Sequence, residues 1–261
     1  MRTLYRTDFH VHTNVSRECG HPEAYPEVMV AAAHEAGLEA VGLTDHIYIP
    51  AQRVRPSETR ARAPHQYQGM PVYIGCEADV VSPTEIVIDA VFAETLDYVL
   101  LSASHLFEPG THHPVAQLGV QEMAAYMVAR MRQAVACGFC DIVVHPFRDD
   151  GGPFSFGELV EAVSPESIKT LVAEAVRAGV AIEYNPRELH GFPDQAHWLY
   201  NRFLEAGVKL SINSDAHHPS KVGCRGPEFA TEAEMRTGGI CEDMLWTIED
   251  GHRHRRNRHP H

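Results

Sequence analysis

The sequence has few of the features that mark membrane, secreted or nucleic-acid-binding proteins. No apolar run approaches the length that spans a bilayer, and none follows the first basic residues, so we expect a cytoplasmic protein with no membrane partner. Only 6 cysteines are scattered through the 261 residues, which favours free thiols over disulfides. Lys and Arg number 22 against 35 Asp and Glu, and the net charge of -13 argues against general nucleic-acid binding unless bound cations reverse the field locally.

Histidine, by contrast, is abundant. The chain has 18 histidines in an otherwise ordinary globular composition of 44% hydrophobic and 22% charged residues. That composition predicts a chain that folds around its own hydrophobic core. Because His is the commonest metal ligand among side chains, the places where the histidines fall become the main question.

The order of elements indicates the fold class. In three places an Ala-rich stretch of helical spacing ends in Gly and leads into a β-branched strand, over residues 25–45, 168–183 and 195–213. The expected helix ends are Gly37, Gly179 and Gly207. Strands alternating with helices predict an α/β fold with a mostly parallel sheet, and the number of units favours a closed or distorted (β/α) barrel over an open doubly wound sheet. Further strands are expected at residues 7–12, 72–77, 98–102 and 141–145, and a long helix at 119–136.

The same pattern suggests one domain. We expect residues 1–250 to form a single barrel and the Arg- and His-rich residues 251–261 to be a disordered tail. The polar segment 50–70 lacks a clean apolar period, so we expect it to be a long loop or a partial helix over one face.

Histidines and acidic residues recur at the carboxyl ends of the predicted strands. In barrels that end carries the chemistry, and strand ends converge in space even when they are far apart in sequence. A single His-X-His is expected about once by chance in a chain this rich in His, and one strand-end His alone is more often a hydrogen-bonded cap. The recurrence of such residues at nearly every strand end is what indicates a metal site. The residues are His10, His12, Asp45, His46, Glu77, His105, His145, Glu183, Asp215 and His217.

This residue set favours an open metal site. A strand points the imidazoles of His10 and His12 to the same face, as two ligands of one ion require. A carboxylate can bridge two ions, and Glu77 is the candidate for that position. Cysteine is absent from the strand ends, which argues against a closed structural thiolate site. Imidazoles mixed with carboxylates suit Zn²⁺, Mn²⁺ or Fe²⁺, and the sequence does not choose among them.

At this point the chain resembles the PHP (polymerase and histidinol phosphatase) superfamily, most closely its stand-alone histidinol-phosphate phosphatases. The matching motifs follow the family's order over about residues 7 to 223. The stretch Gly20-His21-Pro22-Glu23-Ala24-Tyr25 carries the likeness to the phosphatases. The motifs are Asp8-Phe9-His10-Val11-His12-Thr13, Leu43-Thr44-Asp45-His46, Gly75-Cys76-Glu77-Ala78-Asp79, Ser104-His105, Val144-His145-Pro146, Ile182-Glu183-Tyr184-Asn185 and Asn213-Ser214-Asp215-Ala216-His217.

The resemblance implies a distorted (β/α)7 barrel, TIM-like, with two or three divalent ions at the carboxyl ends of its strands. The first ion would be held by His10, His12, Glu77 and Asp215, the second by Glu77, His105 and His145, and the third by His46, His217 and one residue of the loop after His12. For that loop position the resemblance favours Glu18, with His21 as the alternate.

The chemistry implied is hydrolysis of phosphoric esters by a hydroxide that bridges two metal ions. Glu77, Asp215 and His217 are the expected catalytic residues, with His217 or a metal-bound water as the acid for the leaving group. Arg148 and Arg187 are the expected phosphate contacts. Asp8, Asp45 and Glu183 are expected either to orient the imidazoles or to cap strand ends.

Three functions compete at this stage. The leading one is a phosphomonoesterase of histidine biosynthesis that converts L-histidinol phosphate to L-histidinol and phosphate. A second keeps the site but cleaves phosphodiesters of nucleotides or short oligonucleotides, for which the arginines of segment 50–70 would supply a basic surface. The third is a metal-binding structural or regulatory module without catalysis. The sequence leaves the exact substrate and the oligomeric state open.

Overall fold

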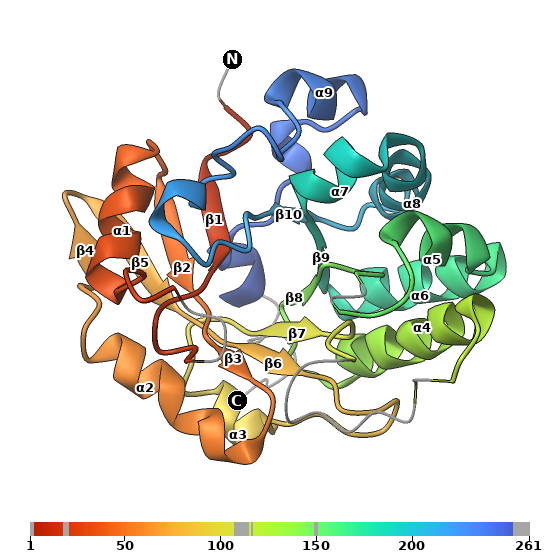
Figure 1. The fold of residues 1–261 in the computed structure, drawn as a ribbon, viewed down its shortest axis with the longest axis horizontal. Helices are drawn as coiled ribbons and strands as arrows, with labels where there is room; N and C mark the ends of the chain where they lie inside the picture. The colour runs from red at the N-terminus through yellow and green to blue at the C-terminus, as the bar shows by residue number, and fades with distance from the viewer. Residues whose placement is uncertain (1–2, 18–20, 107–114, 116, 149–150, 253–261) are drawn as a thin grey trace.

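The computed structural model describes the chain except residues 1–2, 18–20, 107–114, 116, 149–150 and 253–261. Strands alternate with helices along the chain, and the helices lie outside the strands (Figure 1). The strands are β1 (Thr7–Val11), β2 (Ala40–Leu43), β3 (His46–Ile47), β4 (Gln66–Tyr67), β5 (Met70–Ile74), β6 (Glu77–Asp79), β7 (Leu100–Ser102), β8 (Ile142–Val144), β9 (Ala181–Tyr184) and β10 (Leu210–Ile212).

These strands follow one another around a distorted barrel. One sheet has the order β1-β2-β5-β4, and the other has the order β10-β9-β8-β7-β6-β3. The chain runs from β2 into β3 and from β5 into β6, and hydrogen bonds from Gly75 to Leu43 and from Glu77 to Asp45 join the two sheets. Beyond β10, Ala216 pairs in parallel with Val11 of β1. Every pairing among these strands except that of β4 is parallel, which confirms the expected α/β barrel class.

The helices confirm the repeated helix-to-strand plan. Gly37, Gly179 and Gly207 follow α1, α6 and α8 with φ of 78°, 65° and 85°, the left-handed conformation that ends a helix. The long predicted helix is α4, which begins one residue after Gly119. The α-helices are α1 (Pro26–Glu35), α2 (Arg55–Arg60), α3 (Ala90–Ala93), α4 (Val120–Ala136), α5 (Phe156–Ala162), α6 (Pro165–Ala178), α7 (Pro186–Gly191), α8 (Pro193–Glu205) and α9 (Glu232–Thr237), with 3-10 helices η1 (Pro50–Val54), η2 (Pro219–Lys221) and η3 (Glu242–Met244).

Two expectations need correction or refinement. The strand expected over 72–77 is divided into β5 and β6, with Gly75 and Cys76 between them. A Cβ on Gly75 would lie 2.8 Å from the Tyr98 carbonyl oxygen, so the close approach requires glycine there. The Tyr98 side chain also occupies the space above Gly42 and donates its hydroxyl to the Phe9 carbonyl at 2.7 Å. Segment 50–70 contains η1, α2 and β4, so of the two predicted alternatives the partial helix is confirmed and the long loop is not.

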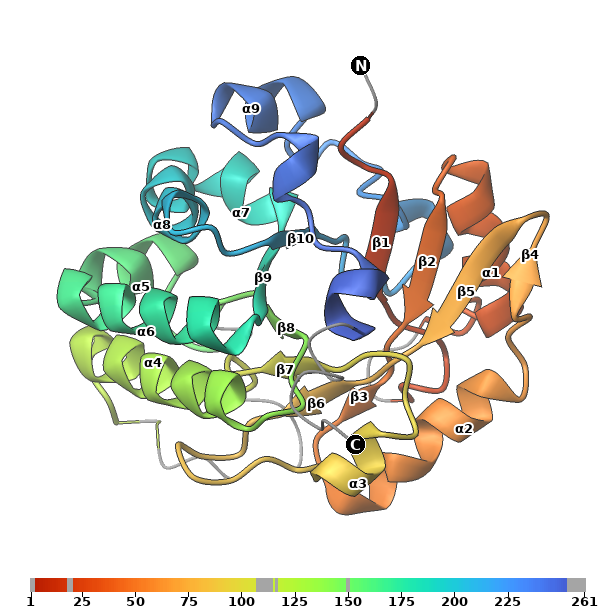
Figure 2. The ribbon, with the colours of Figure 1, turned by 180° about the vertical axis from the view of Figure 1, so that it is seen from behind.

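The amino-terminal end of the barrel is filled by apolar side chains. The chain after β10 returns to lie beside β1 (Figure 2). Trp246 and Ile248 of this segment belong to one buried cluster with Phe9 and Tyr98. The Trp246 amide donates to the carbonyl of Leu210, the first residue of β10, at 2.7 Å. The expected metal ligands lie at the opposite, carboxyl end of the strands. The single-domain boundary at residue 250 stays a prediction, and most of the expected tail lies outside the described residues.

No helix in the described part of the chain is both long enough and apolar enough to cross a bilayer.

Candidate metal centre

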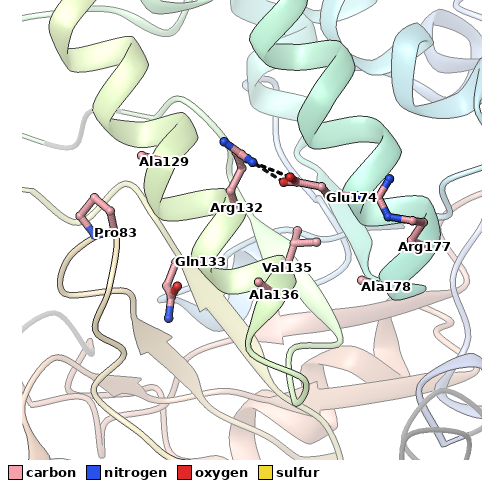
Figure 3. A pocket seen from close by; sticks show the side chains of 9 residues that line it. All are labelled: Pro83, Ala129, Arg132, Gln133, Val135, Ala136, Glu174, Arg177 and Ala178. Carbon is pink, nitrogen blue, oxygen red and sulfur yellow. Dashed lines mark hydrogen bonds and ion pairs between the residues drawn. The ribbon is translucent and has the colours of Figure 1, made fainter.

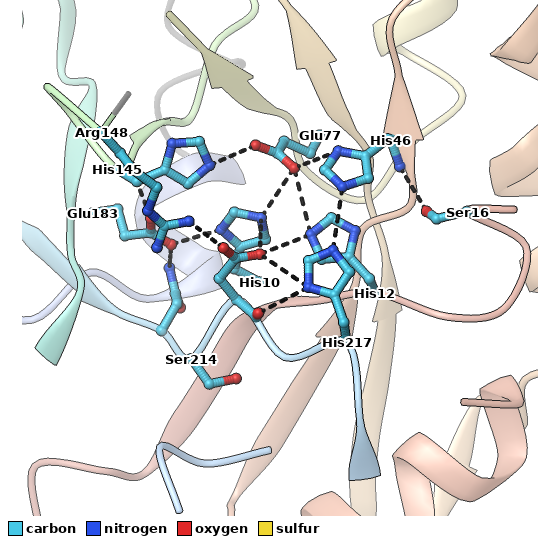
Figure 4. Close-up of polar contacts among 12 residues, drawn as sticks. His10, His12, Ser16, His46, Glu77, His145, Arg148, Glu183, Ser214 and His217 are labelled. Atoms are coloured by element: carbon cyan, nitrogen blue, oxygen red, sulfur yellow. Dashed lines mark hydrogen bonds and ion pairs between the residues drawn. The ribbon is translucent and has the colours of Figure 1, made fainter. Parts of the chain in front are cut away.

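The strand-end histidines and carboxylates meet at the carboxyl end of the barrel. Figure 4 shows the imidazoles of His10, His12, His46, His145 and His217 turned toward the Glu77 carboxylate or toward one another. The Glu77 side chain is 1% exposed or less, and His10 and His12 are fully buried. Because buried imidazoles and carboxylates are costly unless they are paired or coordinated, this cluster calls for a functional explanation.

Four ligand atoms form the set expected for the first ion. His10 Nε2 lies 3.2 Å from Glu77 Oε2 and 3.4 Å from Asp215 Oδ1. His12 Nε2 lies 3.4 Å from Glu77 Oε2 and 3.0 Å from Asp215 Oδ1. Ligands about 2.0–2.2 Å from a tetrahedral ion lie about 3.3–3.6 Å from each other. Two of the four separations lie in that range and two are slightly shorter, so a small adjustment of the side chains would admit one ion. All four atoms are buried without a hydrogen-bond partner among the described residues, which is what a coordination site requires.

The second oxygen of Glu77 faces a different pair of imidazoles. Glu77 Oε1 lies 3.2 Å from His105 Nε2 and 2.7 Å from His145 Nε2. The two oxygens of one carboxylate therefore look toward two sets of nitrogen atoms, as the expected bridging position demands. His46 also approaches, with Nδ1 2.8 Å from Glu77 Oε2, and it forms a compact potential ligand group with Glu77 and His105.

The residues expected for a third ion are only partly brought together. His46 Nε2 and His217 Nε2 lie 3.4 Å apart, and with His12 they form a further potential ligand group. Glu18 lies outside the described residues. His21 is exposed, and its ring contacts that of His218. These two histidines and Glu23 form a separate potential ligand group. The ligand that would complete this site stays a prediction.

Buried hydrogen bonds hold the imidazoles in position. Glu183 Oε1 accepts from His10 Nδ1 at 2.7 Å, which leaves His10 Nε2 facing Glu77 and Asp215. Its other oxygen accepts the backbone N–H of His145 at 2.7 Å. The Ser104 hydroxyl lies 2.9 Å from His145 Nδ1 and directs Nε2 of that ring to Glu77. The expectation that Glu183 orients an imidazole therefore agrees with its contacts.

The other two expected orienting carboxylates bind backbone and hydroxyl groups instead. Asp45 accepts from the Thr13 amide at 2.8 Å and from the Ser16 hydroxyl at 2.8 Å, so it fixes the loop that follows His12. Asp8 accepts the Ser214 hydroxyl at 2.6 Å and thereby holds the chain beside Asp215. Both carboxylates act as loop anchors, the second of the two roles left open by the sequence.

Two of the ligand-type residues have strained backbone conformations. His145 has φ of 26° and Asp215 has φ of 52°, values that are uncommon for residues other than Gly. Each residue follows a strand, β8 or β10, so the strained conformation turns its side chain into the barrel mouth. Strain of this kind persists where the surrounding structure enforces it, and it concentrates at functional sites.

Charges within the cluster keep its carboxylates ionised. Burial raises the pKa of Glu77, but the surrounding imidazoles outweigh that effect and hold the pKa well below its usual value. The pKa of Asp215 is likewise lowered despite burial, by His10 and Arg148. Burial and neighbouring imidazoles lower the pKa of His12 well below its usual value, so its lone pair is available for coordination.

His10 and His105 also have shifted pKa values. Burial lowers the pKa of His105 well below its usual value, which keeps that imidazole neutral as a metal ligand must be. Burial also opposes protonation of His10, but the carboxylates of Glu183 and Glu77 outweigh it and raise its pKa well above the usual value. Coordination would therefore replace a proton on His10.

A pocket of about 480 Å³ opens beside the cluster. Arg148, Arg187, Asp215 and His217 line it together with Glu188 and a group of phenylalanines. Arg148 ion-pairs through Nη1 with Asp215, and its Nε donates to Glu188 at 3.2 Å. The guanidinium of Arg187 lies over the Phe229 ring at 4.8 Å from its centroid. The structure therefore brings both expected phosphate-contacting arginines to one pocket.

Sequence reasoning missed several members of this site. Ser104 and Asn213 lie inside recognised motifs, and their polar side chains next to ligand residues were an available signal. Asn213 donates to Glu183 at 3.0 Å. Glu188 had no signal, because its place depends on how α7 packs against the segment that carries Arg148.

A second pocket, of about 630 Å³, lies between α4 and α6. Figure 3 shows Arg132 and Glu174 joined across it, with Nε 2.7 Å from the carboxylate. Its lining has no histidine, and this arginine and glutamate are already paired. The pocket at the metal cluster is therefore the better candidate for chemistry.

Comparisons with known proteins agree with this site. A family model described as the PHP domain matches residues 8–187. A probable histidinol-phosphatase from Deinococcus radiodurans is 27% identical over 252 residues, covering 86% of this chain and 91% of that protein. The crystal structure of histidinol phosphate phosphatase from Lactococcus lactis, complexed with Zn, L-histidinol and phosphate, superposes with a TM-score of 0.62 at 17% identity, covering 92% of this chain and 98% of that one.

The chain belongs to the PHP domain family, which confirms the resemblance seen in the sequence. The fold, the buried cluster and the family together class it as a metal-dependent phosphoesterase. Among its relatives it is similar to histidinol phosphatases.

Proposed function

We propose that the chain hydrolyses phosphate monoesters, with L-histidinol phosphate, converted to L-histidinol and phosphate, as the first substrate to test. The observation that carries the proposal is the buried set of ligand atoms on His10, His12, Glu77 and Asp215, in which each histidine nitrogen lies 3.0–3.4 Å from both carboxylate oxygens. The names of the Deinococcus and Lactococcus proteins support the choice of substrate.

The donor set fits divalent ions such as zinc, manganese or iron. We assign His10, His12, Glu77 and Asp215 to one ion, and Glu77, His105 and His145 to a second. His46 and His217 would hold a third with Glu18 or His21. Two such ions, when bound, supply an activated water as the nucleophile. The Zn in the Lactococcus structure supports zinc as the first metal to test.

The remaining residues of the site bind and orient the ester. Arg148 and Arg187 present guanidinium groups to the pocket, and such groups match the geometry of phosphate oxygens. Arg148 is positioned by the carboxylates on either side of it, Asp215 and Glu188. His217 is 31% exposed at its side chain and lies at the mouth, where it can give a proton to the departing alcohol oxygen only when it does not hold the third ion.

Cleavage of nucleotides or oligonucleotides is the less favoured alternative. It would need the arginines of segment 50–70 as a basic surface, but these make contacts within the chain. Arg53 pairs with Asp89 at 2.9 Å, and Arg55 is buried and donates to the His46 carbonyl at 2.8 Å. Arg60 lies 3.5 Å from Asp97. The structural-module alternative is disfavoured because the described residues retain both expected ligand sets around Glu77.

The test is steady-state phosphate release by protein loaded with Zn²⁺ or Mn²⁺. L-Histidinol phosphate is compared with a nucleotide monoester and with bis(p-nitrophenyl) phosphate, and the His10→Ala variant is the control. We expect kcat/KM for L-histidinol phosphate of about 10⁴ M⁻¹s⁻¹ or more, lost in the variant. Good cleavage of the diester with weak turnover of the monoester would overturn the substrate assignment, and no release from any ester would overturn the activity.

A further inference from the structure

The pocket beside the cluster contains a carboxylate whose second oxygen has no partner in the fold. Glu188 is 6% exposed and lies on α7. Its Oε1 accepts from Arg148 Nε at 3.2 Å. Its Oε2 is buried and has no hydrogen-bond partner among the described residues, although the side chain lines the pocket. An unsatisfied buried carboxylate oxygen is costly, so the arrangement calls for a donor that arrives with a ligand.

The charge around Glu188 favours a cation. One guanidinium, that of Arg148, is shared between two carboxylates, Glu188 and Asp215. Asp215 Oδ1 faces the histidines of the metal site, which leaves Glu188 Oε2 as the carboxylate oxygen of this row that is available to an amine. Any phosphate would be drawn to the side of the pocket that faces the metal ligands and the arginines. The carboxylate of Glu188 is thus left for the part of the substrate that carries no phosphate.

The pocket wall is aromatic and suits the same kind of ligand. Phe154, Phe156 and Phe192 line it, and the rings of Phe156 and Phe192 lie 5.9 Å apart between centroids. Gly157 permits this packing, since a Cβ there would lie 2.8 Å from the Phe192 ring. Aromatic faces attract ammonium and imidazolium groups and pack well against a planar ring.

We propose that Glu188 is a specificity-determining residue that binds a protonated amine on the alcohol part of the substrate. The substrate class is then phosphate monoesters of cationic amino alcohols, with the phosphate at the metal cluster and the amine at Glu188 Oε2. The proposal rests on the proposed phosphomonoesterase function and deepens it. An ester without the cation leaves Oε2 buried and unpaired, so it binds less well.

The experiment compares esters with a charged amine and with a neutral acetylated amine. Acetylation also adds bulk, so the effect is read as the change in preference between the parent protein and the variant. L-Histidinol phosphate and its N-acetyl derivative are assayed on metal-loaded protein, and p-nitrophenyl phosphate reports hydrolysis without an amine. We expect Glu188→Gln to reduce the preference for the free amine over the acetylated ester by about 10- to 100-fold, mainly through KM. Glutamine can still accept from Arg148, so the change removes the charge and keeps that contact. Glu188→Asp, which restores the charge, should recover part of the preference.

Controls separate this proposal from its alternatives. Glu166→Gln removes a carboxylate that is 76% exposed on α6 and should leave the preference as it is in the parent protein. Equal losses on both esters in Glu188→Gln would overturn the proposal and assign Glu188 to positioning Arg148. A parent protein that does not prefer the free amine would overturn it as well.

A binding measurement keeps the proposal testable without turnover. Calorimetry of L-histidinol with the zinc-loaded protein should show affinity at least about tenfold weaker in Glu188→Gln. Unchanged affinity would refute the role of Glu188. Failure of all ester hydrolysis, including that of p-nitrophenyl phosphate, would refute the proposed function while the calorimetry still decided on the amine site.

Discussion

Replacing Glu183 by Gln should weaken metal binding although the residue lies behind the ligands. In the fold its carboxylate accepts three hydrogen bonds, from His10 Nδ1 at 2.7 Å, the backbone N–H of His145 at 2.7 Å and the side-chain NH2 of Asn213 at 3.0 Å. A glutamine has the same shape but offers one acceptor oxygen and one NH2 group. In either orientation at least one of the three donors then faces another donor.

The expected loss of metal affinity follows from the one donor left without an acceptor. Leaving one buried donor unsatisfied costs about 1–3 kcal/mol, and losing an oriented partner of a ligating imidazole typically lowers metal affinity about 10- to 100-fold. That range corresponds to about 1.4–2.8 kcal/mol. With metal in excess, the gap in melting temperature between metal-loaded and metal-free protein should narrow by about 3–10 °C.

The assay is a competition titration of Zn²⁺ against a chromophoric chelator, with thermal melting of both forms. Glu166→Gln, the exposed charge-removing variant on α6, should behave as the parent protein in both measurements. If Glu183→Gln lowered the stability of the metal-free protein but kept the zinc affinity within about threefold, Glu183 would support the fold alone. The account of how His10 is oriented would then be wrong.

Three further predictions concern the barrel itself. Gly42→Ala places a Cβ 1.9 Å from the Tyr98 hydroxyl and should lower the free energy of unfolding in urea by at least about 1–3 kcal/mol, whereas Gly191→Ala meets no atom within 4 Å and should change it little. Arg130→Met removes the guanidinium that pairs with the buried Asp79 carboxylate at 2.7 Å and should cost about 3–5 kcal/mol in the same experiment; a loss below about 1 kcal/mol would show that the pair is dispensable. Burial raises the pKa of the Cys224 thiol well above its usual value, so alkylation at pH 8, followed by mass spectrometry, should be at least about tenfold slower in folded than in urea-unfolded protein, and the rate should rise with pH; equal rates would contradict the burial.

The convergence of the candidate ligand residues could be predicted from the sequence because its signal is local, whereas their assignment as metal ligands stays a prediction. The hydrophobic periodicity and the Gly residues that end the helices locate the strands. A His or acidic residue at the carboxyl end of a parallel strand then lies at the same end of the barrel as the others. His105 and His145 lie on neighbouring strand ends for this reason alone. The positions of these residues were predictable even though most of the strand ends are far apart in sequence.

The sequence could not supply contacts that depend on packing between distant segments. The need for glycine at position 75 comes from the carbonyl of Tyr98, which lies just before β7. Glu188 contacts Arg148 across 40 residues of sequence, through the relative placement of two strand-end loops. Ser104 lies in a recognised motif beside His105, but its hydrogen bond goes to His145 on the next strand end, and only the assembled barrel identifies that partner.

The central claim is that Glu77 bridges metal ions held by the strand-end histidines. Anomalous diffraction at the zinc edge from crystals of the zinc-loaded protein tests it most directly. The account predicts one peak among His10, His12, Glu77 and Asp215 and another on the opposite side of the Glu77 carboxylate, with both peaks lost in Glu77→Gln. Zinc only at surface sites, or no peak beside Glu77, would contradict it.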